Sequence, residues 1–262
     1  MIRVGVIGAA GRMGRTVCRA VAEEPDLALV AAVDRSDVGE AAVDDDVRIS
    51  DDLEALVQAD AEVAVDFTHP SAVMDNVRWA IDHAIHIVVG TTGWTDDDLA
   101  EIGQRLDKGG NASNAIVAPN FAIGAVLAQR FAAEAARYLP AAEIIELHHD
   151  GKADAPSGTA LATARRLAAE RAEAYRGPDA ETLAGSRGGD VEGVRIHSVR
   201  LPGLVAHQEV ILGGAGQVLT IRHDSLDRSS FMPGVLLAIR EVGRRPGLTV
   251  GLEPLLERGG PR

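Results

Sequence analysis

The sequence is poor in cysteine, in basic residues and in long apolar runs. Cys18 is the only cysteine, which excludes an intrachain disulfide and a zinc site built on two cysteines. No segment approaches the ~18 consecutive apolar residues of a membrane-spanning helix. The chain also opens without a basic segment followed by an apolar one. We therefore expect a cytoplasmic protein in which Cys18 is buried in a helix.

Acidic residues outnumber basic ones in this chain of 262 residues. Asp and Glu total 39, Lys and Arg total 26, and the net charge is −13. A surface of this sign repels phosphate backbones and anionic membranes, so neither nucleic acid nor a membrane is expected as a partner. It also means that a site for an anionic ligand must supply its own local positive potential.

Short apolar runs alternate with amphipathic stretches over the first 120 residues. The runs are rich in Val and Ile and too short for helices, as in strands buried on both faces of a parallel sheet. They comprise residues 2–7, 28–33, 63–65, 85–89 and 115–118. Helical spacing appears from Met13 to Val21 and again from Pro70 to Ile81. This alternation predicts an α/β fold with a Rossmann-like doubly wound parallel sheet.

The pattern changes after about residue 143. A run at 143–149 leads into a loop and then into a predicted helix from Ser157 to about Arg171. Residues 175–193 lack periodicity and are predicted to form a loop. Three β-like runs follow at 194–201, 208–212 and 218–223, and the glycine-rich link 213–216 predicts a hairpin. These adjacent strands indicate an α+β unit, after which Phe231–Val242 forms one more amphipathic helix.

A glycine-rich loop follows the first predicted strand and opens a helix. Its residues are Gly8-Ala9-Ala10-Gly11-Arg12-Met13-Gly14. Glycines allow a tight turn and let amides approach a pyrophosphate at the positive end of the helix. Asp34 ends the second strand, where an acid can bind the adenosine ribose. Because Arg35 follows directly and could hold a 2′-phosphate, we predict the use of both NADH and NADPH. A glycine turn without a ligand is the alternative.

Two further segments follow predicted strands, at the carboxyl ends where open α/β sheets bind ligands. They are Gly90-Thr91-Thr92, within a run that continues to Gly93, and Ala118-Pro119-Asn120-Phe121. Their small and polar residues are candidates to line the nicotinamide side of a cofactor site. Plain turns are the alternative.

The segment ELHHDGKADAPSGTA, residues 146–160, contains the candidate chemistry. A histidine can deliver a proton near neutral pH, and Lys152 adds a cation that can bind a carboxylate or transfer a proton. His148 and His149 point to opposite faces of a strand and cannot readily chelate one metal. Without a second cysteine or an HExxH spacing, no metal site is predicted. A structural histidine is the alternative to a catalytic one.

The same segment contains a helix start, Pro156-Ser157-Gly158-Thr159. Proline and a hydroxyl residue favour the first positions of a helix, and glycine leaves the amides unobstructed. Open amides at a helix N-terminus bind carboxylate or phosphate, so together with Lys152 they predict a site for a dianion. Arg228, ahead of the last predicted helix, could bind the anion, orient Lys152 or be solvated. Asp154 could serve only to fix the loop.

These motifs resemble those of the dihydrodipicolinate (4-hydroxy-tetrahydrodipicolinate) reductase family of the diaminopimelate–lysine pathway. The resemblance covers nearly the whole chain and rests on GAAGRMG at 8–14, DFTHP at 66–70, VGTTGW at 89–94, APNFAIG at 118–124 and ELHHDGKADAPSGTA at 146–160. It implies a cyclic dicarboxylate substrate that bears an imine. After loss of water, hydride from NADH or NADPH reaches C4 of the conjugated imine, and protonation of the resulting enamine gives tetrahydrodipicolinate.

The resemblance also implies roles for individual residues. His148 matches the proton donor of the family, and Lys152 matches its second catalytic residue. His149, Gly158 and Thr159 match substrate contacts, and Arg228 matches an arginine near the catalytic lysine. The cofactor contacts that match are the residues from Gly8 to Met13, Asp34, those from Gly90 to Thr92 and those from Ala118 to Phe121. From the residues themselves we also expect Lys152, Ser157 and Arg228 to contact the substrate and Arg35 to contact the cofactor. Trp94 stands where members of the family often have Phe.

The domain organisation follows from the same resemblance. A dinucleotide-binding domain is expected to comprise residues 1–122 and 228–262. Residues 123–227 are expected to form a substrate-binding and tetramerisation domain with an open mixed sheet, giving a homotetramer. Two other functions are compatible with the glycine loop alone: another NAD(P)-dependent dehydrogenase of small amino or hydroxy acids, and a nicotinamide-binding sensor without turnover.

Overall fold

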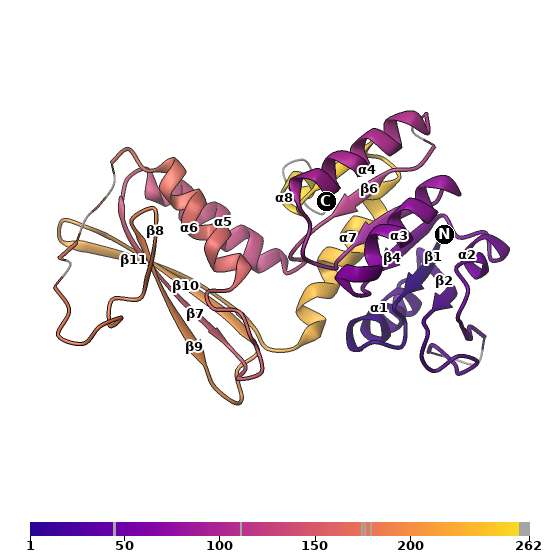
Figure 1. Ribbon diagram of the computed structural model, residues 1–262, viewed down its shortest axis with the longest axis horizontal. Helices are drawn as coiled ribbons and strands as arrows, with labels where there is room; N and C mark the ends of the chain where they lie inside the picture. The colour runs from indigo at the N-terminus through magenta and orange to yellow at the C-terminus, as the bar shows by residue number, and fades with distance from the viewer. Residues whose placement is uncertain (44–45, 111, 174, 176, 179, 257–262) are drawn as a thin grey trace. The chain divides into compact units, whose positions relative to one another are not determined.

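The computed structural model describes residues 1–43, 46–110, 112–173, 175, 177–178 and 180–256. The chain divides into two units: one contains Met1–Phe121 and the chain from Phe231 onward, and the other contains Ala122–Ser230. The predicted domains comprised residues 1–122 with 228–262, and residues 123–227. Residues 257–262 of the first predicted domain lie outside the described residues. Each unit is built on a sheet of its own (Figure 1).

A seven-stranded sheet, parallel throughout, forms the centre of the first unit. Its strands are β1 (Ile2–Ile7), β2 (Leu27–Val33), β3 (Ile49–Ser50), β4 (Val63–Asp66), β5 (His86–Val89), β6 (Ala115–Val117) and β12 (Leu248–Val250). The order β12-β6-β5-β4-β1-β2-β3 reverses direction at β1, which confirms the predicted doubly wound parallel sheet. The strand β12, which the sequence patterns did not reveal, pairs with β6 at one edge.

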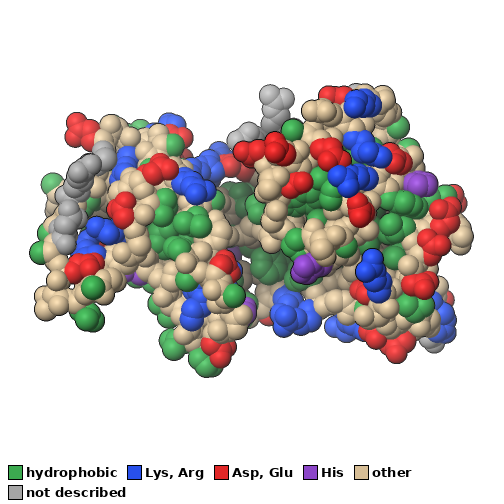
Figure 2. All heavy atoms as spheres, in the orientation of Figure 1, with side chains coloured by type: hydrophobic (Ala, Val, Ile, Leu, Met, Phe, Trp, Pro, Cys, Tyr) green, Lys and Arg blue, Asp and Glu red, His purple; other side chains and the backbone are tan. Residues whose placement is uncertain are grey.

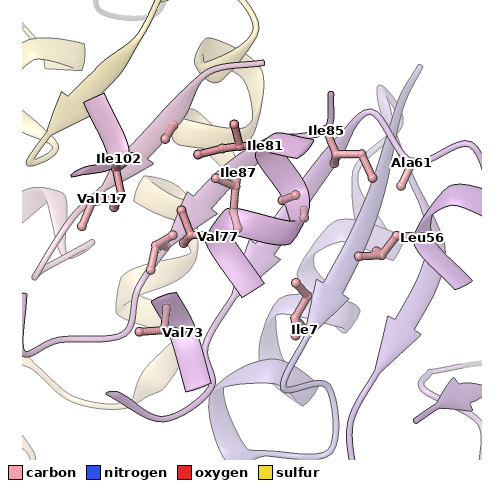
Figure 3. Packing of buried hydrophobic residues seen from close by; sticks show 14 of the residues in the cluster. Ile7, Leu56, Ala61, Val73, Val77, Ile81, Ile85, Ile87, Ile102 and Val117 are labelled. Atoms are coloured by element: carbon pink, nitrogen blue, oxygen red, sulfur yellow. The ribbon is translucent and has the colours of Figure 1, made fainter. Parts of the chain in front are cut away.

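Helices of the first unit bury one apolar side each. They are α1 (Arg12–Glu23), α2 (Glu54–Gln58), α3 (Pro70–Asp82), α4 (Asp96–Lys108), α7 (Met232–Val242) and α8 (Glu253–Leu256). On α3, Val73, Val77 and Ile81 pack in one cluster with Ile87 and Val117 of the sheet (Figure 3). Full burial of such a side chain stabilises the fold by about 1.5–3 kcal/mol, so this spacing explains why α1, α3 and α7 form where they were predicted.

Cys18 is fully buried on α1, as predicted. Burial raises the pKa of its thiol to about 12. Because the thiolate is the reactive form of cysteine, this side chain is a packing residue. Within the described residues, no helix is both long and apolar enough to cross a membrane.

The second unit contains a five-stranded mixed sheet. Its elements are α5 (Ile123–Ala136), β7 (Ala141–His148), α6 (Gly158–Glu170), β8 (Gly189–Val191), β9 (Val194–Arg200), β10 (Ala206–Gly214) and β11 (Gln217–Ser225). The order is β11-β10-β7-β9-β8, with β7 and β9 parallel and the other pairs antiparallel. The predicted hairpin is confirmed, with Gly214 opposite Gln217.

One prediction for this unit is wrong. Residues 189–191 lie in the predicted loop but form the edge strand β8, which pairs with β9. Gly189 and Asp190 are exposed, so the strand has no apolar alternation that the sequence could reveal. Two residues of the predicted loop, 176 and 179, lie outside the described residues.

The two helices of the second unit lie on one face of its sheet (Figure 1). Ile144, Val210 and Leu212 of the strands are buried with Ala132 and Leu167 of the helices in a single cluster. Strand side chains alternate between faces, so their neighbours in sequence, such as Ile145 and Ile211, point away from the helices and are only half-buried. This second face, which α5 and α6 do not cover, carries apolar side chains together with charged ones such as Glu143 and Glu209.

Candidate active site

The glycine loop joins β1 to α1 in the way that a dinucleotide site requires. Gly8 has φ +84°, and the amides of Gly8 and Ala9 donate to the Val33 carbonyl at 2.8 and 3.1 Å. A Cβ on Gly14 would lie 1.9 Å from the Gly8 carbonyl oxygen, so only glycine lets α1 approach the loop this closely. No side chain caps α1 at Gly11. The open amides fit a pyrophosphate group.

Asp34 follows β2, at the position predicted for the ribose acid. Its Oδ2 accepts a hydrogen bond from the amide of Ala10 at 3.0 Å, and Oδ1 accepts one from the amide of Ser36 at 2.9 Å. The carboxylate therefore fixes the glycine loop, and its remaining lone pairs are available to a ligand. Arg35, the next residue, and Arg12, the first residue of α1, are both exposed. Their contacts to a cofactor stay a prediction.

Asp66, at the carboxyl end of β4, is a residue whose role the sequence did not reveal. It is fully buried, and Oδ1 accepts hydrogen bonds from the amide and hydroxyl of Thr68 at 2.8 and 2.7 Å and from the Thr91 hydroxyl at 3.2 Å. Oδ2 accepts from Asn76 at 2.8 Å. Burial raises the pKa of Asp66, and these hydrogen bonds oppose that shift. One carboxylate thus joins the loops after β4 and β5.

The segments predicted for the nicotinamide side follow β5 and β6 in the first unit. The Gly90 amide donates to the Asp66 carbonyl at 2.9 Å, and the Ala118 amide donates to the Val89 carbonyl at 3.0 Å. The ring of Phe121 packs against that of Phe67, with centroids 5.8 Å apart. Neighbouring carboxyl ends of the sheet therefore bring both segments to the same edge. Thr91 is buried, whereas Thr92 and Pro119 are exposed and Asn120 is half-buried.

Trp94 contributes a contact that a phenylalanine could not make. Its indole Nε1 donates a hydrogen bond to the Thr91 carbonyl at 2.7 Å. Thr91 is therefore fixed by two hydrogen bonds: Trp94 donates to its carbonyl, and its hydroxyl donates to Asp66.

The predicted proton donor, His148, is the last residue of β7. Alternation along the strand places Glu146 on the same face, and the Nδ1 atom of His148 lies 2.5 Å from Glu146 Oε2. The imidazole is 15% exposed. Burial lowers its pKa below the ordinary value of histidine, and hydrogen bonding to Glu146 partly offsets this, while Lys152 and Arg200 lower the pKa further.

Glu146 and Arg200 form a pair that the sequence patterns did not predict. The carboxylate is fully buried, and the guanidinium of Arg200 meets both of its oxygens, with Nη1–Oε2 2.9 Å and Nη2–Oε1 2.8 Å. Burial raises the pKa of Glu146, but hydrogen bonds, foremost those from Arg200, outweigh it and leave the pKa below the ordinary value. The carboxylate is therefore ionised at neutral pH.

Lys152 lies on a turn after β7, where its amide donates to the His149 carbonyl at 3.2 Å. Its ammonium group pairs with Asp154, whose role the sequence left open, at 2.7 and 2.9 Å. His149 is exposed. Arg228, at the start of the short helix η1 (Arg228–Phe231), is also exposed and forms no ion pair with any residue that the structure describes. Its proposed contacts to Lys152 or to a substrate stay a prediction.

The helix start predicted at residues 156–159 is present as the beginning of α6. Ser157 is buried, its hydroxyl accepts a hydrogen bond from the Ala160 amide at 3.2 Å, and its own amide donates to Glu146 at 3.3 Å. Ser157 is therefore the cap of this helix. Gly158 is exposed and Thr159 half-buried, so these two positions are the accessible part of the helix start. No cluster of three or more metal-ligating side chains occurs in the part of the chain that is described.

A doubly wound sheet with an open glycine loop, followed by an α+β unit that contains a histidine–glutamate pair, defines a two-domain dinucleotide-dependent oxidoreductase. Comparison with protein families gives a narrower result. The model for the N-terminus of dihydrodipicolinate reductase matches residues 2–121, and the model for its C-terminus matches residues 124–256. The chain belongs to the dihydrodipicolinate reductase family.

Similar proteins agree with this assignment. Relatives named 4-hydroxy-tetrahydrodipicolinate reductase from Nocardia farcinica and Mycolicibacterium vanbaalenii are 54% and 53% identical, each over 98% of this chain and 99% of the relative. The solved structure of a dipicolinate-bound dihydrodipicolinate reductase from Paenisporosarcina sp. TG-14 is 42% identical, with a TM-score of 0.86 over 97% of this chain and 99% of that one. An amine dehydrogenase from Mycobacterium smegmatis, 14% identical with a TM-score of 0.65 over 95% of this chain and 94% of its own, shares the fold alone.

Proposed function

We propose that the chain reduces 4-hydroxy-tetrahydrodipicolinate, by way of dihydrodipicolinate, to tetrahydrodipicolinate with NADH or NADPH, in diaminopimelate and lysine biosynthesis. One observation carries the proposal: His148, backed by Glu146, lies in the second unit within electrostatic reach of Lys152, and the same short segment continues into the open start of α6. A proton donor beside two anion-binding elements suits the reduction of a small dicarboxylate. Membership of the family supports the same reaction.

The use of lysine in this chain supports a chemical role for Lys152. Only Lys108 and Lys152 occur in the sequence, so the other 26 − 2 = 24 basic residues are arginines. Lys108 is exposed at the end of α4. An ammonium group can give up a proton when its surroundings favour this, whereas a guanidinium stays charged. A lysine at position 152 therefore indicates a need for an ammonium group there.

The electrostatics of the chain favour a local anion site. Acidic and basic side chains are interspersed over the face of the molecule shown in Figure 2, and the net charge is −13. In the second unit, Lys152 and the amides of Gly158 and Thr159 would bind one carboxylate of the substrate, with His149 and Arg228 as further contacts. Nε2 of His148 would deliver the proton that the enamine takes up.

The first unit would bind the cofactor. The residues from Gly8 to Met13, with Asp34 and Arg35, would hold its adenosine and pyrophosphate groups, and the segments from Gly90 to Thr92 and from Ala118 to Phe121 would surround the nicotinamide. When bound, NADH or NADPH supplies the hydride that adds to C4 of the conjugated imine. Since Asp34 and Arg35 favour different ribose groups, we expect both cofactors to be used with modest preference. A thousandfold discrimination in kcat/KM would contradict this.

The second unit would also form the subunit contacts of a cytoplasmic homotetramer. The sheet face opposite α5 and α6 presents half-buried apolar side chains, among them Ile145, Leu147 and Ile211. Apolar side chains rimmed by polar ones, as on this face, mark association surfaces. Light scattering should give the mass of four chains, and Ile211→Glu should lower that mass. A wild-type protein that is monomeric at micromolar concentration would contradict the proposal.

A coupled assay tests the activity directly. The product of the preceding synthase is generated in the cuvette, the purified chain is added, and the loss of nicotinamide absorbance is followed with NADPH and with NADH. We expect oxidation of both cofactors that depends on the synthase product. Turnover only with amino or hydroxy acids would indicate another dehydrogenase, and no turnover with any of these substrates would indicate a sensor.

A further inference from the structure

The buried carboxylate of Glu146 is hydrogen-bonded to His148, the proposed proton donor. We propose that Glu146, fixed in place by Arg200, is a positioning residue that keeps a proton on Nδ1 of His148 and leaves Nε2 as the atom that exchanges a proton with the substrate. This inference rests on the proposed role of His148 as proton donor.

The geometry at His148 determines which ring nitrogen is protonated in the neutral imidazole. Glu146 is ionised, and an ionised carboxylate only accepts hydrogen bonds. The 2.5 Å contact between Nδ1 and Oε2 therefore places the hydrogen on Nδ1. Among the residues that the structure describes, none forms a hydrogen bond with Nε2. The second nitrogen is thus the one that gains and gives up the proton.

Glu146 is suited to this task because its surroundings keep it charged and immobile. A buried carboxylate is costly unless it is paired and hydrogen-bonded. Arg200 forms a bidentate ion pair with both carboxylate oxygens, and the amide of Ser157 donates a further hydrogen bond to Oε1 at 3.3 Å. The parallel register sets Arg200 directly beside His148, on the neighbouring strand β9. The carboxylate therefore cannot turn away from the imidazole without leaving Arg200 unpaired.

Arg200 also connects this pair to the loop of the proposed substrate site. Its Nη2 donates a second hydrogen bond, to the backbone carbonyl of Asp154 at 2.7 Å. Asp154 in turn holds Lys152. One guanidinium thus fixes the carboxylate behind the proton donor and the backbone of the loop that presents the ammonium group.

Charges around His148 give the inference a measurable consequence. Glu146 on the same strand stabilises the imidazolium, whereas Arg200 from β9 and Lys152 from the following loop oppose it, as burial does. Glu146 is the acidic group among these, so its neutralisation should lower the pKa of His148. The alkaline limb of the pH profile of kcat/KM, along which the acid form is lost, should then move to lower pH.

The test compares the wild-type enzyme with Glu146→Gln. We expect kcat at neutral pH to fall about ten- to hundredfold, less than the 10²–10⁴ expected for complete loss of a general acid. The alkaline limb should move to lower pH, and the KM of NADPH should stay constant. If the single variant is poorly folded, the double variant Glu146→Gln/Arg200→Gln leaves no buried charge unpaired. Its alkaline limb should move in the same direction but by less, because the loss of Arg200 removes a charge that opposes the imidazolium. Glu101→Gln is the matched control, since it removes an equivalent bidentate ion pair with Arg78 on the surface of α4.

Nuclear magnetic resonance gives a second measurement that does not depend on turnover. Long-range ¹H–¹⁵N spectra, with His148 assigned from the His148→Gln variant, should show the Nδ1–H tautomer in the wild type and a shift toward Nε2–H in Glu146→Gln. An unchanged tautomer and an unmoved alkaline limb, with only a lower melting temperature, would overturn the inference and leave Glu146 as a structural residue. Full turnover in His148→Gln would instead refute the proposed proton donor, and the spectra would still show whether Glu146 sets the tautomer.

Discussion

Lys152 donates to both oxygens of a single carboxylate, that of Asp154, with Nζ 2.7 Å from Oδ1 and 2.9 Å from Oδ2. The side chain of Lys152 is 23% exposed and that of Asp154 is 59% exposed. The ammonium group is therefore held by an accessible carboxylate of its own chain, in the way that a substrate carboxylate would hold it. Asp154 would thus compete with the proposed substrate for the same partner.

Removal of this competitor should improve substrate binding by a small factor. An exposed ion pair contributes about 0.2–1 kcal/mol, which corresponds to at most about fivefold in an equilibrium constant. Asp154→Asn should therefore lower the KM of the dicarboxylate by no more than about fivefold and leave the KM of NADPH unchanged. Steady-state kinetics at low and high salt measure this, because screening should reduce the difference. A higher substrate KM at an unchanged melting temperature would show that Asp154 assists binding.

Replacement of the proposed proton donor should affect turnover far more than binding. His148→Gln should lower kcat by about 10²–10⁴, the range for loss of a general acid, with little effect on the dissociation constant of NADPH. The pKa of His148 is lowered, chiefly by burial, and an acid is active only while protonated. In the wild type, kcat/KM should therefore decline as the pH rises through a value below the ordinary pKa of histidine, and the variant should lack this limb. An unchanged kcat would remove His148 from the mechanism.

The parts of the fold that the sequence predicted are those with strong local patterns. Buried runs of Val and Ile gave the central strands, and Val73, Val77 and Ile81 gave α3. In contrast, α5 was missed because most of its buried residues are alanines, which mark no clear apolar stripe. The helix α4 was also missed, although Thr95 and Asp98 form a reciprocal capping box at its start, which is a signal that the sequence does contain.

For the candidate site, too, only the residues that are close together in the sequence were predicted to lie together. His148, Lys152 and the helix start lie within one short segment, so their proximity could be inferred without a structure. Arg200 meets Glu146 across 54 residues, and only the parallel register of β7 with β9 places them together. Pairing between strands of this separation leaves no local pattern, which is why Arg200 was not identified.

The scarcity of lysine allows a nearly site-specific test of Lys152. In the variant Lys108→Arg, Lys152 is the single lysine of the chain, and this variant should retain wild-type activity because Lys108 is exposed at the end of α4. An amine-reactive reagent should then inactivate the enzyme, and dipicolinate, a cyclic dicarboxylate, should slow the inactivation. Mass spectrometry locates the label.

Substitution of the same lysine should agree with the labelling. Lys152→Ala should lower kcat and raise the KM of the dicarboxylate, since it removes a charge-assisted contact. Lys152→Arg retains the charge and should recover binding more than turnover. If Lys152→Ala changed only the melting temperature, the residue would be structural.

The close approach of α1 to the glycine loop can be tested with two substitutions of the same kind. A Cβ at Gly14 would lie 1.9 Å from a backbone oxygen that cannot move aside, whereas a Cβ at Gly103, inside α4, would meet nothing within 4 Å. Gly14→Ala should therefore destabilise the protein by about 1–3 kcal/mol through overpacking. Gly103→Ala should stabilise it by about 0.5–1 kcal/mol, the preference of a helix interior for alanine.

Cofactor binding separates a local effect at this loop from a general loss of stability. Gly14→Ala displaces the amides that would meet the pyrophosphate, so the dissociation constant of NADH, measured by fluorescence titration below the melting transition, should rise at least about tenfold, equivalent to about 1.4 kcal/mol. Gly103→Ala should bind NADH as the wild type does. If both variants bound NADH with wild-type affinity, the loop at Gly8–Gly14 would not be the pyrophosphate site, and the cofactor would have to bind elsewhere in the first unit.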